Sequence, residues 1–199
     1  MTIEEYFDLC RHTGVREPDF IKNGTWETTE EFRRKLMRHV LSNYRTYRRY
    51  GENVIQVLEK YMAPTRKDAE APERSALVEE YIERGRKKLL EEHAQSVAEN
   101  PKYLTLIGEI ETAVRCVRST PGRGELFHNA LHYRYMFGER ECPIEIICGI
   151  MSISQASFYQ YLDKGMEEAG RFLFPRIDFC IKEAESYRRK KRKEMVPEG

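Results

Sequence analysis

The spacing of apolar residues most constrains the fold, because apolar side chains recur every three or four positions in almost every segment of the chain. Phe32, Leu36, Val40 and Tyr44, for example, follow one another at steps of four, which places them on one face of an α-helix. No segment alternates apolar and polar residues over the length of a half-buried strand. We therefore predict an all-α protein in which a helical N-terminal region is joined to a C-terminal helix-turn-helix domain.

The helical pattern divides the chain into three predicted parts. Residues 1–63 form an N-terminal helical region whose function the sequence does not indicate. Residues 64–101 combine a linker, marked by prolines among mixed charges, with a long charged helix over about 75–99. Residues 102–199 contain the predicted helix-turn-helix domain and end in a basic tail.

Local signals predict where the N-terminal helices begin and end. Gly14 can supply the left-handed residue that ends the first helix. Thr28 precedes Glu31 by three residues, which is the spacing of a capping box. We expect the helix that begins there to end at Gly51, and a further short helix to run to about Met62.

Charge, cysteine content and hydropathy bound the class of protein. The chain carries 34 Lys and Arg against 33 Asp and Glu, a net charge of +1, so a nucleic-acid function has to rest on local clusters of charge. Its 5 cysteines are widely spaced and contain no CxxC pair, which indicates reduced thiols rather than a disulfide framework. No apolar run approaches the roughly 18 to 20 residues that span a bilayer. We expect a soluble cytoplasmic protein without a membrane segment.

Residues 143–165 have the sequence pattern of a helix-turn-helix, and two helices over about 103–118 and 125–137 are predicted to precede it. Pro143 suits the first position of a helix because its missing N–H is not needed there. The first helix then has an apolar face made of Ile144, Ile147, Cys148 and Met151. Ser152 stands where such turns usually have glycine, so it is expected to need a positive φ.

The second helix of the pattern is predicted to begin after Ser154, whose hydroxyl can cap the free amides of the first turn. Ile153 is the apolar residue expected to be buried in the turn, and Phe158 and Leu162 are expected to point inward. The first turn of such a helix reaches base edges when it enters the major groove. The residues predicted to contact DNA are Ser154, Gln155, Ala156, Ser157, Tyr159, Gln160 and Lys164.

The side chains of this second helix suggest separate roles. Gln155 can pair bidentately with adenine, and the methyl group of Ala156 can contact a thymine methyl. Ser157 and Lys164 are placed for backbone phosphates, which position a protein without reading sequence. The alternative is an ordinary helical hairpin in which Ser154 only caps a surface helix.

Two runs within residues 107–174 carry a resemblance to a known family. They are residues 131–136, Leu-His-Tyr-Arg-Tyr-Met, and residues 153–165, with the core Ile-Ser-Gln-Ala-Ser-Phe-Tyr-Gln-Tyr-Leu. This half of the chain resembles the sigma-70 region-4-like domain of phage transcriptional regulators of the ArpU and RinA type. The resemblance implies binding to double-stranded DNA, control of phage or mobile-element genes, and contact with RNA polymerase.

Two basic clusters lie outside the predicted helix-turn-helix. The C-terminal run over 187–193 predicts salt-sensitive contacts to DNA phosphates, and its alternative is a solvated helix end. The residues predicted to make these contacts are Arg188, Arg189, Lys190 and Lys191. Basic residues over 33–38 are followed by interleaved arginines and tyrosines over 44–50, which suits phosphate contact or stacking. An exposed helix with its tyrosines in the core explains this cluster better.

No metal, cofactor or catalytic site is predicted. His128 and His132 are four residues apart, but no glutamate follows His128 as an HExxH site requires. Cys142 and Cys148 lack the spacing of a structural zinc site. The chain contains neither a phosphate-cradling GxxxxGK[ST] loop nor a GxSxG motif, so an enzyme is not expected.

Two further functions stay open from the sequence alone. The unmatched N-terminal half and the nearly neutral charge fit a protein-interaction module that inhibits or adapts a host machine. A DNA-packaging adaptor like a small terminase subunit also uses a helix-turn-helix. Because helix-turn-helix proteins often read two half-sites as dimers, a homodimer is a possible partner, and the sequence leaves the oligomeric state open.

Overall fold

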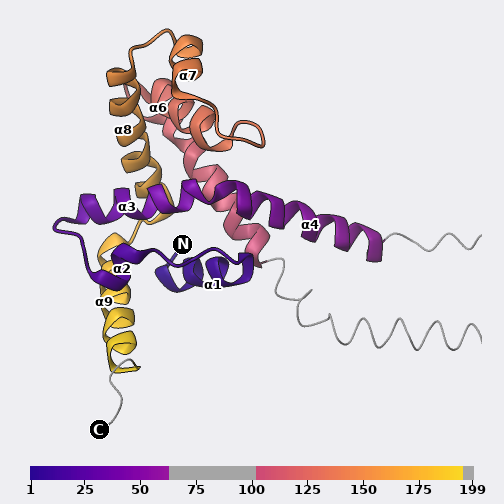
Figure 1. Ribbon diagram of the computed structural model, residues 1–199, viewed down its shortest axis with the longest axis vertical. Helices are drawn as coiled ribbons and strands as arrows, with labels where there is room; N and C mark the ends of the chain where they lie inside the picture. Colours follow the sequence, from indigo (N-terminus) through magenta and orange to yellow (C-terminus); the bar gives the residue numbers. More distant parts are fainter. Residues whose placement is uncertain (63–101, 195–199) are drawn as a thin grey trace, which may run out of the picture. The chain divides into compact units, whose positions relative to one another are not determined.

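The computed structural model describes residues 1–62 and 102–194, and every regular element in these residues is a helix (Figure 1). No strand is present among them, which confirms the predicted all-α class. The predicted linker and the charged helix over about 75–99 lie outside the described residues.

The N-terminal residues form four helices: α1 (Ile3–Thr13), α2 (Asp19–Asn23), α3 (Thr29–Ser42) and α4 (Tyr44–Met62). Helix α1 begins at a capping box. The Thr2 hydroxyl accepts a hydrogen bond from the Glu5 N–H at 3.2 Å, and the Glu5 carboxylate accepts one from the Thr2 N–H at 2.7 Å. The helix ends at Gly14, whose φ of 71° is left-handed as predicted.

Helix α3 has half of the capping box predicted for it. The Thr28 hydroxyl accepts from the Glu31 N–H at 3.1 Å, as expected. The Glu31 carboxylate, however, accepts from the N–H of Glu27 at 2.7 Å, and it pairs with Lys35 at 2.7 Å. This carboxylate therefore satisfies a donor one residue before the cap rather than the N–H of Thr28.

The prediction that α3 continues to Gly51 is wrong, because the helix ends at Ser42. The side-chain amide of Asn43 donates to the backbone oxygen of His39 at 2.8 Å, which occupies a carbonyl that the helix would otherwise use. The chain resumes at Tyr44 as α4, and α4 passes through Gly51 without a break. A glycine inside a helix costs only about 1 kcal/mol, so it does not by itself end one.

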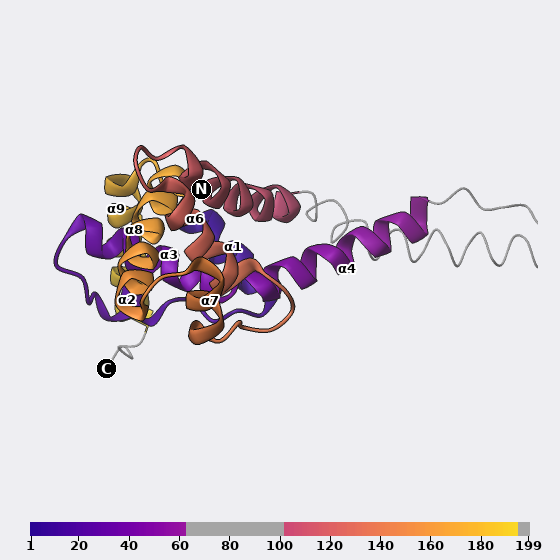
Figure 2. The ribbon, with the colours of Figure 1, turned by 90° about the horizontal axis from the view of Figure 1, so that it is seen from above.

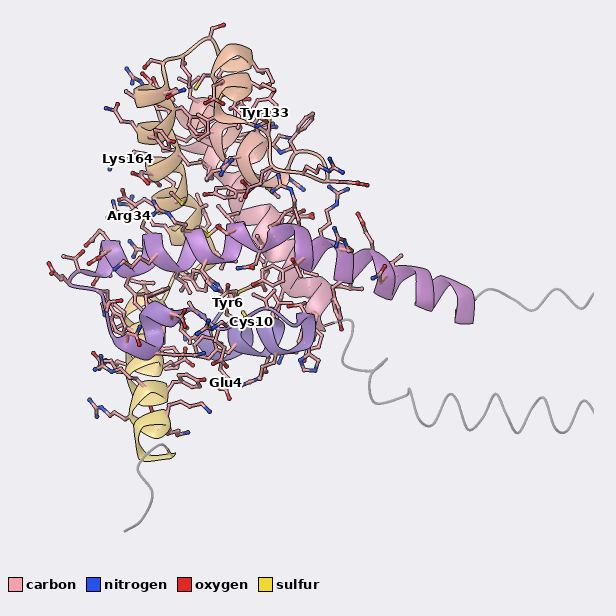
Figure 3. All side chains as sticks on the ribbon, viewed as in Figure 1. Glu4, Tyr6, Cys10, Arg34, Tyr133 and Lys164 are labelled. Atoms are coloured by element: carbon pink, nitrogen blue, oxygen red, sulfur yellow. The ribbon has the colours of Figure 1, made fainter. Side chains whose placement is uncertain are left out.

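A cluster of buried polar groups joins α1, α3 and α4. The Tyr6 hydroxyl lies 2.5 Å from His39 Nδ1 and 3.1 Å from the Tyr47 hydroxyl, and Cys10 Sγ lies 3.6 Å from that same hydroxyl. Figure 3 shows Tyr6 and Cys10 beside α3. Burial raises the pKa of Tyr6 well above its ordinary value and lowers the pKa of His39, so both groups are uncharged at neutral pH. Each hydroxyl has a partner, which offsets the cost of burying it.

The described C-terminal residues form a helix over 102–116, a 3-10 turn η1 (Val117–Ser119), α6 (Gly124–Leu131), a π-helical turn η2 (His132–Met136), α7 (Ile144–Met151), α8 (Gln155–Leu173) and α9 (Ile177–Glu194). The two helices predicted before the helix-turn-helix pattern are therefore present. The second of them is divided, since α6 continues as the π turn, which the sequence does not predict.

The side chain of Arg45 holds the segment at the end of the π turn. Its Nη2 donates to the backbone oxygens of Arg134 at 3.2 Å, Phe137 at 3.3 Å and Arg140 at 3.2 Å. Its Nε donates to the oxygen of Gly138 at 3.4 Å. Carbonyl groups that a helix end leaves without partners are thus satisfied by a residue of α4.

Helix α8 packs against both α6 and α3 (Figures 1 and 2). Its buried apolar residues are Phe158, Leu162, Met166, Ala169 and Leu173. Two glycines allow the close contact. A Cβ on Gly165 would lie 2.9 Å from the backbone oxygen of Phe127 in α6, and one on Gly170 would lie 2.6 Å from Cγ of Arg33 in α3. The position of α8 is therefore set from two sides.

The contacts divide the chain into two compact units. The first combines Met1–Arg49 with Leu106–Gly199, and the second spans Tyr50–Thr105. The divisions drawn from the sequence fall near residues 63 and 101, between an N-terminal and a C-terminal part. The structure instead places α1 to α3 in the same unit as α6 to α9, because α3 packs along α8 and also against α9.

Gly165→Ala should destabilise the protein, because the added Cβ meets a backbone oxygen that cannot move independently. We expect the free energy of unfolding to fall by about 2 kcal/mol, as is usual for an overpacked core. Gly108→Ala is the matched control, since Gly108 is also helical and an added Cβ meets nothing within 4 Å. That change should raise the free energy of unfolding by up to about 1 kcal/mol. Urea unfolding measures both, and equal stabilities would contradict this packing.

Candidate nucleic-acid interface

Helices α7 and α8 are joined by a tight turn of the predicted kind. Ser152 adopts a φ of 53° and a ψ of 45°, and it is the one non-glycine residue with a positive φ in the described parts of the chain. Its N–H donates to the backbone oxygen of Gly149 at 3.2 Å, and the N–H of Ile153 donates to that of Cys148 at 3.1 Å. The expectation that this serine takes the conformation of a turn glycine is thus confirmed.

Ser154 caps α8 as predicted. Its backbone is extended, and its hydroxyl accepts from the N–H of Ser157 at 3.1 Å. The hydroxyls of these two serines also lie 3.0 Å apart, so the Ser157 side chain is directed to the cap. Phe158 and Leu162 are buried as expected, whereas Ile153 is half-buried.

The predicted contact residues at the start of α8 are accessible. Ser154, Gln155, Ala156, Tyr159, Gln160 and Lys164 are exposed, and Ser157 is half-exposed. Because residues four apart lie above one another on a helix, these side chains form two neighbouring rows. One row contains Ala156, Gln160 and Lys164, and the other contains Gln155 and Tyr159.

Acidic residues limit this surface toward the C-terminal end of α8. Lys164 Nζ lies 3.0 Å from a carboxylate oxygen of Glu167, and Arg171 pairs with Glu167 at 2.6 Å and with Glu168 at 3.0 Å. Burial alone would raise the pKa of Glu167, but Lys164 and Arg171 lower it below its ordinary value. Lys164 is therefore the basic residue at the C-terminal end of its row, and the acidic residues Glu167 and Glu168 follow it on α8.

The structure does not bring the basic C-terminal run next to Gln155. Arg188 to Lys191 lie on α9, which packs against α1, α2 and α3 and extends away from the N-terminal end of α8 (Figure 1). The Arg188 guanidinium lies 5.8 Å from the centre of the Trp26 ring, and Arg189 pairs with Glu185 at 4.0 Å. These cations belong to a different face from the start of α8.

The second basic cluster lies on α3 and the start of α4, where Arg34, Arg38, Arg48 and Arg49 are exposed. Arg33 lies along Gly170, Arg38 pairs with Asp163 at 3.1 Å, and the Tyr44 hydroxyl donates to Glu111 at 2.5 Å. Tyr44 and Tyr47 are buried, which confirms the interpretation for these two tyrosines, whereas Tyr50 is half-buried. Arg34 is exposed on α3, on the same side of the view as Lys164 (Figure 3).

The two histidines predicted not to bind metal line a hollow of about 230 Å³ with Arg115 and Arg118. The rings of His128 and His132 are stacked, with centres 5.6 Å apart and planes inclined by 13°. Burial lowers the pKa of both histidines, and the nearby charge of Arg118 lowers it further. No group of three or more His, Cys, Asp or Glu placed to bind a metal occurs in residues 1–62 and 102–194.

No role is predicted for Arg123 from the sequence. Its Nη1 donates to the hydroxyl of Tyr161 at 3.2 Å, which places a cation beside the outward row of α8. The sequence holds no local signal for this contact, because the two residues lie in different helical segments.

Among the described helices, none has the length and apolar character needed to cross a membrane.

Substitutions in the turn between α7 and α8 should have opposite effects on stability. Ser152→Gly removes the strain of a left-handed serine and should raise the free energy of unfolding by about 1 kcal/mol. Ser154→Ala removes the cap of α8 and should lower it by about 1 kcal/mol. Thermal unfolding measures both variants. A loss of stability in Ser152→Gly would show that the turn is not left-handed in solution.

Comparisons with family models, with curated proteins and with solved structures found no match to this chain. The resemblance of residues 107–174 to sigma-70 region 4 therefore rests on the residues that carry it.

Proposed function

We propose that this protein is a sequence-specific DNA-binding transcriptional regulator that acts by binding rather than by catalysis. The observation that carries the proposal is the start of α8, which is capped by Ser154 after a left-handed turn and exposes Gln155, Ala156 and Gln160. In a helix-turn-helix, the helix that follows the turn is the one that enters the major groove.

Each exposed residue has a role in the proposed complex with double-stranded DNA. Gln155 and Gln160 carry amides that pair bidentately with adenine, and Ala156 lies between them where its methyl group can meet a thymine. Tyr159 lies beside Gln155 and adds contact area at the edge of the groove. Lys164 binds a backbone phosphate. For this contact, its ammonium group must leave the carboxylate of Glu167, with which it is paired in the free protein.

The ArpU and RinA resemblance supports a regulator of phage or mobile-element genes that works in the cytoplasm and contacts RNA polymerase. We include a homodimer in the proposal, because helix-turn-helix proteins often bind two half-sites of DNA as dimers.

Binding to DNA selected from a random pool tests the proposal. Gln155→Ala and Gln160→Ala should each weaken binding to the selected sequence by about tenfold or more, because a bidentate base contact is lost. Neither change should alter binding to random DNA, which depends on phosphate contacts. Lys182→Ala, an exposed change on α9, is the control and should leave both affinities unchanged. Equal weak binding of all sequences would contradict sequence-specific recognition.

A second candidate function is supported by the outer face of α7. Ile146 and Ile150 are four residues apart and are 54% and 53% exposed, which is unusual for large apolar side chains. This face suits a protein-interaction module better than a phosphate backbone. Replacing both isoleucines with aspartate should then abolish co-purification of a protein partner. Loss of DNA binding in that variant, with no partner recovered from the wild type, would contradict this second function.

A further inference from the structure

A shallow hollow of about 360 Å³ flanks the middle of α8 and faces the start of α6. It is lined by Arg123, Phe127, Gln160, Tyr161, Asp163 and Lys164. Two of these residues, Gln160 and Lys164, belong to the exposed row of α8 described above. The hollow is therefore continuous with the surface proposed to meet DNA.

Arg123 is exposed at the edge of this hollow, where Tyr161 orients its side chain. Its Nη1 donates to the Tyr161 hydroxyl at 3.2 Å, and its guanidinium carbon lies 5.6 Å from the centre of the Tyr161 ring. Phe127 supports that ring from α6, with the ring centres 5.9 Å apart. The guanidinium has five N–H donors, and the one contact to Tyr161 leaves the others available.

The turn that carries Arg123 is also fixed. The next residue, Gly124, packs so closely on the preceding 3-10 turn that a Cβ there would lie 2.6 Å from the backbone oxygens of Val117 and Arg118. The backbone that carries Arg123 is therefore fixed by packing, and the hydrogen bond to Tyr161 orients its side chain.

The charges of the neighbouring residues single out Arg123. Lys164 is paired with Glu167, and Asp163 is paired with Arg38 at 3.1 Å. No ion pair neutralises Arg123 within the described parts of the chain. Arg123 is therefore a cation without a neutralising partner among the described residues. Tyr161 orients it before any ligand binds, and it lies beside Gln160 and Lys164 of α8.

We propose that Arg123 binds a backbone phosphate of the DNA strand that borders the groove entered by α8, with Tyr161 as the residue that positions it. This inference rests on the proposed function. A planar guanidinium matches the oxygens of a phosphate in a bidentate geometry. The contact fixes the register of α8 and carries no sequence information, in contrast to the contacts of Gln155.

The salt dependence of DNA binding tests this role. Arg123→Ala should weaken binding to selected and to random DNA by the same factor, about tenfold at low salt, because a charge-assisted contact is lost. It should also reduce the slope of the logarithm of affinity against the logarithm of salt concentration by about one. Arg176→Ala, at an exposed arginine between α8 and α9, is the matched control and should change neither quantity.

A second variant separates positioning from folding. Tyr161→Phe keeps the ring and removes the hydroxyl that holds Arg123, so it should lower affinity by a smaller factor and leave the salt slope unchanged. Thermal unfolding of each variant shows whether it is folded at the assay temperature. If Arg123→Ala does not fold, Arg123→Gln provides the same loss of charge with a side chain of similar length.

The outcomes distinguish this inference from the function on which it rests. If Gln155→Ala weakens only selected DNA while the Arg123 variants leave affinity and salt slope unchanged, the role of Arg123 is overturned and the proposed function stands. If no sequence is preferred but Arg123→Ala still reduces the slope, sequence-specific reading fails and the phosphate contact stands. If the wild type binds no DNA at low salt, both are overturned.

Discussion

The close approach of α8 to two other helices is the constraint on which the described C-terminal region depends. Gly165 brings its backbone against the Phe127 oxygen of α6, and Gly170 leaves room for the Arg33 side chain of α3. Both glycines lie in the second half of a helix of 19 residues. The packing therefore holds α8 by its later turns, with Phe158 and Leu162 anchoring the earlier ones, and leaves the outer side of its first turns exposed.

The same packing decides which cations are available for a partner. Arg33 and Arg38 of α3 lie against α8, and the guanidinium of Arg45 is committed to four backbone oxygens of the segment after α6. These three arginines therefore join helices of one unit. Arg123 differs from the other exposed cations because it lines the hollow beside Gln160 and Lys164.

The parts of the fold that sequence reasoning predicted are those set by neighbouring residues. Apolar spacing locates the helices, and Ser152 and Ser154 occupy the turn and cap positions that local chemistry requires. The parts it missed depend on distant contacts. The π turn is held by Arg45, which is 89 residues from Arg134 in the sequence. The pairing of Arg123 with Tyr161 spans 38 residues, so no local pattern could indicate it.

Reading and holding DNA are separate tasks in the proposed interface, and different residues perform them. Gln155, Ala156 and Gln160 carry no charge, while the charge of Lys164 is shared with Glu167, so one copy of the chain offers few phosphate contacts. Because such contacts supply most of the affinity, a single copy would bind weakly at physiological salt. Tight binding would require a second copy or a protein partner. Ile146 and Ile150 on α7 are exposed and supply an apolar surface to which such a partner can bind. This surface lies next to the turn between α7 and α8. The two candidate functions are therefore compatible, since a partner on α7 would raise the affinity of a helix that reads DNA.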